Sequence, residues 1–155
     1  MKHALLLLFA FVAFFSCTKK ECDCVPPPGQ VDYLIIGYSS CFCVDCCTTG
    51  YKLTDGKIYL GERTEPDKYT FQTTALDQAK YDQTKVLIDE FPTQLLGENN
   101  AFYGCGGCAD QPVYYVEMKK NGQVYSWHID SVTNGFPDYV KEYAQKLSDA
   151  FGKLQ

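Results

Sequence analysis

The residues best suited to chemistry in this 155-residue chain are its cysteines. Four of the nine fall within seven positions, in the sequence CFCVDCC at 41–47, and a further pair forms CGGC at 105–108. Thiolates at such spacings suit zinc or copper(I), and a C-x-x-C pair suits redox exchange. In an exported chain, cysteines usually form disulfides instead. The compartment of the protein therefore decides between these chemistries.

The first residues predict that the chain is exported. Residues 4–15 form an uninterrupted apolar run of about twelve residues, which suits a signal-peptide core and is too short to span a bilayer. Ser16 and Cys17 close this run. A small residue followed by Cys resembles the lipobox of bacterial lipoproteins, in the loose form found in Bacteroidota, although two phenylalanines precede it here. The resemblance implies that residues 1–16 are a signal peptide and that Cys17 carries the lipid.

The rest of the chain divides into a tether and one domain. Residues 17–30 read as a tether, because three consecutive prolines favour an extended spacer. Residues 31–155 are the usual length of a single domain. The chain carries 14 basic and 19 acidic residues without a basic stripe, so we expect no nucleic-acid partner. We expect a membrane contact through the lipid, no cofactor, and a place in the cell envelope, on the outer membrane facing the periplasm or the surface.

With Cys17 set aside, an even number of cysteines remains, which predicts a disulfide framework. The disulfide candidates are Cys22, Cys24, Cys41, Cys43, Cys46, Cys47, Cys105 and Cys108. Cysteines within 41–47 make poor partners for one another, since adjacent or same-face positions give strained or unreachable bridges. We therefore expect bridges between distant segments, with the pairing open. The alternative is a thiol-redox role or a zinc or copper site, with candidate ligands Cys41, Cys43, Cys46, Cys105 and Cys108.

Two dipeptides predict tight β-hairpins in the domain. Asp55-Gly56 and Asn121-Gly122 are preferred in two-residue turns and lie between β-prone runs. The implied cross-strand pairs are Leu53 with Ile58, Tyr51 with Leu60, Met118 with Tyr125, Val116 with Trp127, and Tyr114 with Ile129. Another strand is expected from residue 31 towards the first cysteine cluster, and an edge strand near residues 69–73. Each hairpin has a helix after it, so an internal duplication remains open, although the two hairpins differ in register.

Two helices complete the expected fold. One should begin with Thr74 as its N-cap, with Asp77 reaching back, and end before Pro92. The other should begin near Pro137. Its apolar residues follow the 3.6-residue period of an amphipathic helix: Val140, Tyr143, Ala144, Leu147, Phe151 and Leu154. The predicted fold class is α+β, an antiparallel sheet of hairpins with two helices packed on one face, supported by disulfides.

We predict no catalytic residues. His128 is expected on the solvent face of its strand, with Asp130 on the same face and Tyr115 opposite, but no nucleophile elbow accompanies them. Residues from about 105 to 145, including CADQPVYYVEMKKNGQVYSWHID, resemble a segment of small exported Bacteroidota proteins with no assigned activity. The leading hypothesis is a lipid-anchored envelope protein with a binding or structural role. A small inhibitor of an envelope hydrolase is a further alternative, and the ligand or protein partner stays open.

Overall fold

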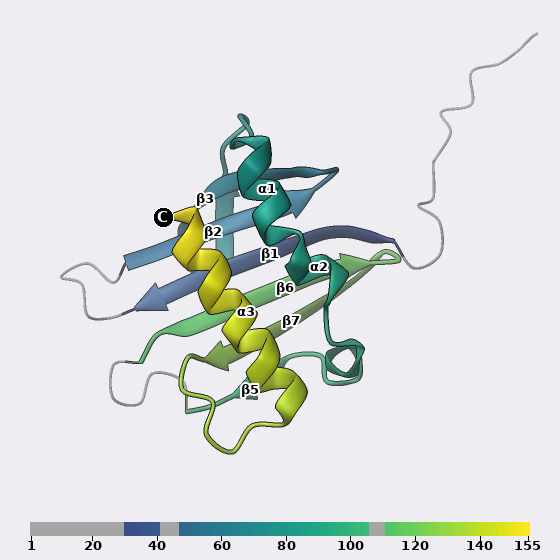
Figure 1. The fold of residues 1–155 in the computed structure, drawn as a ribbon, viewed down its shortest axis with the longest axis vertical. Coiled ribbons are helices and arrows are strands. Elements are labelled where there is room, and N and C mark those ends of the chain that lie inside the picture. The colour runs from purple at the N-terminus through teal and green to yellow at the C-terminus, as the bar shows by residue number, and fades with distance from the viewer. Residues whose placement is uncertain (1–29, 41–46, 106–110) are drawn as a thin grey trace, which may run out of the picture.

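The computed structural model describes residues 30–40, 47–105 and 111–155 (Figure 1). These residues form a mixed α+β fold built on a seven-stranded sheet of order β4-β3-β2-β1-β6-β7-β5. The strands are β1 (Val31–Ser40), β2 (Cys47–Thr54), β3 (Lys57–Glu65), β4 (Lys68–Phe71), β5 (Ala101–Tyr103), β6 (Val113–Lys120) and β7 (Gln123–Asp130). Every pairing is antiparallel except that of β5 with β7, so the α+β prediction is confirmed.

Both predicted hairpins form in the predicted register. Leu53 pairs with Ile58 across β2 and β3, and Val116 pairs with Trp127 across β6 and β7. All four turn residues have positive φ, between 50° and 77°, as a type I′ turn requires. Asn, Asp and Gly tolerate this conformation, so the turn residues and the register agree.

Strand β1 joins the two hairpins through non-local pairing. It lies between β2 and β6, with Ile36 opposite Tyr51 on one side and Val116 on the other. The predicted edge strand appears as β4, which pairs with β3. Strand β5 was not predicted. It has only three residues, too few to show an alternating pattern, and its neighbour Asn100 has a φ of 62°.

The first predicted helix is shorter than expected and interrupted. It consists of α1 (Gln78–Thr84) and α2 (Val86–Asp89), followed by the 3₁₀ helix η1 (Thr93–Gly97). The capping prediction was wrong, since Asp77 is itself the N-cap and its side chain makes no capping bond. The backbone N–H of Leu76 donates to the Ile58 carbonyl at 2.8 Å, which holds this segment against β3 before the helix can begin.

The last helix, α3 (Asp138–Leu154), follows the predicted apolar pattern. All six predicted core residues of this helix are buried. In Figure 1, α3 lies across one face of the sheet, and α1 and α2 lie on the same face. Trp127 is buried beneath them, and its indole N–H lies 3.0 Å from the carbonyl oxygens of Leu95 and Glu98.

No helix in the described part of the chain is both long and apolar enough to cross a membrane.

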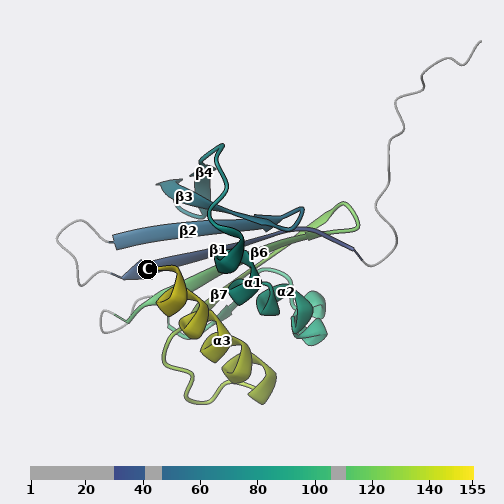
Figure 2. The same ribbon diagram turned by 45° about the horizontal axis from the view of Figure 1, so that its top comes forward.

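The sheet face that carries α3 holds the core. The opposite face, which we call the open face, has no helix against it within the described residues, and the end of β3 with β4 stands on that side (Figure 2).

Candidate functional site

A single row of side-chain positions crosses the open face through all seven strands. Three neighbouring strands contribute glycines to it, and the strands at either side contribute rings. In sheet order the paired residues are Phe71, Gly61, Gly50, Gly37, Tyr115, His128 and Phe102. The three glycines leave a shallow depression between two aromatic ends, because they place no side chains on this face.

Tyr69 of β4 fills part of this depression. A Cβ atom at Gly50 would lie 2.5 Å from Tyr69 Cε1, and one at Gly37 would meet the Tyr69 hydroxyl. A Cβ at Gly61 would lie 2.6 Å from two ring atoms of Phe71. Real Cβ atoms do not approach so closely, so only glycine at these positions admits the two rings. The hairpin of β3 and β4 therefore folds back over the open face, as Figure 2 shows.

The rings form a continuous series across the face. Tyr69 stacks with Phe71 and with Tyr115, at centroid distances of 6.2 Å and 6.1 Å. His128 follows, 5.3 Å from Tyr115 and 5.3 Å from Phe102, with its plane only 13° from that of Phe102. These separations lie in the range in which aromatic pairs attract one another. The series ends at Phe102, which is 47% exposed.

A contact between Asp67 and His128 joins the tip of the β3–β4 hairpin to the far side of the sheet. Asp67 has a φ of 61°, and its Oδ1 lies 3.0 Å from His128 Nε2 on β7. The two side chains are partly exposed, so this contact adds little stability by itself and serves to position the hairpin tip. His128 therefore lies on the open face opposite Tyr115, as predicted, but under the hairpin rather than in solvent.

Asp130 differs from the prediction, which placed it in solvent beside His128. It is only 2% exposed, and its Oδ2 accepts a hydrogen bond of 2.8 Å from the backbone N–H of Cys105. Gly104, with a φ of 119°, leaves space for this carboxylate, because a Cβ there would overlap it. Asp130 therefore holds the end of β5 and is not a member of the His128 pair.

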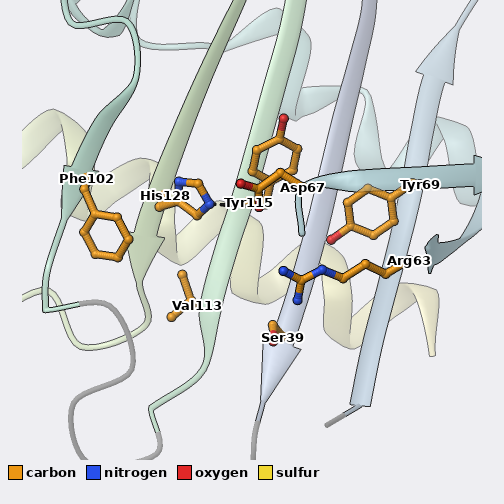
Figure 3. Close-up of a pocket in the computed structure, with 8 residues that line it drawn as sticks. All are labelled: Ser39, Arg63, Asp67, Tyr69, Phe102, Val113, Tyr115 and His128. Carbon is orange, nitrogen blue, oxygen red and sulfur yellow. Dashed lines mark hydrogen bonds and ion pairs between the residues drawn. The ribbon is translucent and has the colours of Figure 1, made fainter. Parts of the chain in front are cut away.

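The hairpin and the sheet enclose a half-open cavity of about 160 Å³ (Figure 3). Strands from both halves of the sheet contribute to its wall. The lining residues are Ser39, Arg63, Asp67, Tyr69, Phe102, Val113, Tyr115 and His128. Figure 3 shows the Arg63 guanidinium extended towards Ser39, with the Tyr69 hydroxyl beside it, while His128 lies farther along the sheet towards Phe102 and is joined to Asp67 by a dashed line.

The polar groups of the cavity differ in whether they have hydrogen-bond or charged partners. Arg63 Nε donates to the Glu65 carbonyl at 3.2 Å, and the described residues include no carboxylate in an ion pair with this guanidinium. Burial raises the pKa of Tyr69, although Arg63 opposes the shift. Burial also raises the pKa of Tyr115, and so does its 2.6 Å hydrogen bond to Glu117. Both phenols therefore stay neutral at physiological pH, and Arg63 is the cation available to a ligand.

The predicted cysteine sites fall mostly outside the described residues. This holds for Cys17, Cys22, Cys24, Cys41, Cys43, Cys46 and Cys108, and so for most of the alternative metal site. Cys47 begins β2 opposite Ser40, and Cys105 lies two residues beyond the end of β5. In the regions that the structure describes, no three His, Cys, Asp or Glu side chains gather as a metal site.

Sequence reasoning did not identify most of the cavity. The hairpin pattern places His128 opposite Tyr115, but it assigns no role to Arg63, Asp67 or Phe102. The available signal was the presence of Gly37, Gly50 and Gly61 within β-prone runs, where glycine often marks a close approach of other atoms. Comparison with protein-family models and with curated protein sequences found no match for this chain.

Proposed function

We propose that this protein is a lipid-anchored protein of the cell envelope that binds a small ligand, without catalysis, in the cavity on its open face. The observation that carries this proposal is the way the cavity is built. Three glycines in register admit Tyr69 and Phe71 to the sheet surface, and Asp67 at the hairpin tip contacts His128 across it. Concave sites with aromatic walls and a few convergent polar groups are typical of ligand binding.

The polar groups favour binding over catalysis. His128 Nε2 faces Asp67, and Ser39 lies across the cavity beside Arg63 in Figure 3. The described residues contain no hydrogen bond from Ser39 to His128, which a nucleophile and its base would need. The cavity therefore offers hydrogen bonds, one cation and ring faces to a bound molecule.

A ligand-observed and protein-observed NMR screen tests the binding role. Small ring compounds, with and without charge, are added to the isotope-labelled full chain in detergent. We expect the amide signals of Phe102, Tyr115 and His128 to shift together for some of these compounds. Shifts confined to residues outside the cavity, or none with any ring compound, would refute this role for the cavity.

The membrane anchor rests on the apolar run that ends at Cys17. A single acyl chain binds membranes weakly, so stable attachment needs the additional chains that a lipoprotein carries. The substitution Cys17→Ser should move the protein from the membrane fraction to the soluble fraction. Continued attachment of this variant to membranes would contradict lipidation at Cys17.

Disulfides that link the cysteine segments remain part of the proposal. The described flanks of two segments support it: Ser39 pairs with Val113 and Ser40 pairs with Cys47, so residues 41–46 and 106–110 both connect to the same end of adjacent strands. Mass measurement of the mature protein after alkylation should show the eight cysteines unreactive until a reductant is added. Four or more reactive thiols with stoichiometric zinc or copper would instead establish the metal-binding alternative.

A further inference from the structure

The cavity also indicates which class of ligand it takes, an inference that rests on the binding role proposed above. We infer that the ligand presents a single six-membered sugar ring bearing a carboxylate, as in a uronic acid residue. Three properties of the cavity lead to this class: its size, its Arg63 cation, which has no carboxylate partner among the described residues, and its hydroxyl-binding side.

The size of the cavity limits the ligand to about one ring. Its volume is about 160 Å³. A closed protein cavity of roughly 150 Å³ holds one benzene molecule, so a single six-membered ring is the matching unit. Tyr69, Tyr115 and Phe102 provide the walls, and Phe102 stands at the exposed rim. Such a rim allows the ring to be one unit of a longer chain that continues into solvent.

The charge of the cavity selects an anion. Arg63 lies in the wall with its guanidinium directed inward, and it has no carboxylate partner among the described residues (Figure 3). A guanidinium binds a carboxylate through two parallel hydrogen bonds, which is its preferred geometry. Ser39 lies beside it and can donate one further hydrogen bond. The chain as a whole carries a net charge of −5, so general electrostatics repel anions and attraction must come from this site.

The opposite side of the cavity suits hydroxyl groups. Asp67 lines the cavity, its Oδ1 contacts His128, and its Oδ2 has no hydrogen-bond partner among the described residues. A carboxylate oxygen accepts from a hydroxyl but repels a second anion. A ring with a carboxylate at one end and hydroxyls at the other therefore matches the two sides. A planar aromatic carboxylate would satisfy Arg63 and leave Asp67 without a donor.

A matched pair of closed-ring sugars tests this inference. Methyl β-D-glucuronide and methyl β-D-glucoside differ only in the carboxylate at C6, and benzoate supplies a carboxylated ring without hydroxyls. Saturation-transfer NMR on the full chain in detergent gives an affinity for each. We expect the glucuronide to bind at least about tenfold more tightly than the glucoside and benzoate, which is the range for a hydrogen-bonded charged pair.

Two variants test whether Arg63 causes the preference for the glucuronide. Arg63→Gln should remove the advantage of the glucuronide, so that the two sugars bind this variant with similar affinity. Lys52→Gln is the matched control, because it removes one positive charge from the same face, near Tyr33 and Phe71, outside the cavity lining. This variant should keep the preference.

The outcomes separate the two proposals. Equal affinity for the two sugars, equal affinity for benzoate, or an unchanged preference in Arg63→Gln would each overturn the uronate inference while the binding role stands. If the broader screen also finds no ring compound that shifts the amide signals of the cavity residues, the binding role itself is refuted.

Discussion

Replacing Gly50 with alanine should destabilise the protein only while Tyr69 is present. Gly50 lies in β2 in register with Gly37 and Gly61, and a Cβ there would lie 2.5 Å from Tyr69 Cε1. Overpacking of this kind costs about 1–3 kcal/mol. Alanine in a strand gains back about 0.5–1 kcal/mol, because it loses less backbone entropy than glycine on folding. The net loss expected for Gly50→Ala is therefore about 1–2 kcal/mol.

The same substitution should be harmless in a Tyr69→Ala background. Tyr69→Ala alone loses two ring contacts, each with a free energy of about 0.5–1.5 kcal/mol, so we expect a loss of about 2 kcal/mol. The double variant has space for the new methyl group and should be as stable as Tyr69→Ala or slightly more stable. The coupling free energy between the two positions should then be about 2 kcal/mol.

Urea denaturation followed by tryptophan fluorescence measures the free energy of unfolding of the native protein, of the two single variants and of the double variant. Trp127 is the only tryptophan and is fully buried, so its emission reports unfolding of the sheet. Gly152→Ala is the control, since nothing lies within 4 Å of the added Cβ, and it should stabilise α3 by about 0.5–1 kcal/mol in either background. Additivity of Gly50→Ala and Tyr69→Ala within about 0.5 kcal/mol would refute the packing of the hairpin on the glycine row.

Three other predictions concern the core, pH and the hairpin tip. Trp127→Phe removes the indole N–H that the Leu95 and Glu98 carbonyls share, while each carbonyl keeps a backbone donor, so it should cost about 0.5–1.5 kcal/mol beyond the loss of volume. Circular dichroism in urea measures this, and an unchanged midpoint would contradict the hydrogen bonds. Burial raises the pKa of Tyr33 from 10.0 to about 12 and also raises that of Tyr143, so the folded state retains protons that the unfolded state has lost. The free energy of unfolding should therefore be fully present below pH 10 and fall as pH rises through 12, measured by urea denaturation at each pH; a free energy of unfolding that does not fall across this range would be the opposite result. Asp67→Asn should change the unfolding free energy by less than about 1 kcal/mol, because its contact with His128 is partly exposed, and a loss above 2 kcal/mol would show that the hairpin tip holds the fold together.

Local patterns in the sequence were sufficient for the hairpins and for α3. The Asp55-Gly56 and Asn121-Gly122 turns accept positive φ at both positions, and a two-residue turn fixes every pair that follows it. The apolar period of α3 likewise identified its buried face, because the helical repeat of 3.6 residues per turn depends only on residues close in sequence. The start of α1 was misplaced because a non-local bond from Leu76 to β3 competes with the helix.

The sequence by itself therefore determined the turns, the registers within each hairpin and the covered face of the sheet. Only the tertiary structure decided the cavity. Gly37, Gly50 and Gly61 come from three strands, and their alignment depends on β1 pairing between the two hairpins. Asp67 meets His128 across 61 residues of chain, after β3 and β4 have folded over that row. Turn and helix geometry are fixed by neighbours in sequence, whereas a site assembled from six strands depends on distances that exist only once the sheet has formed.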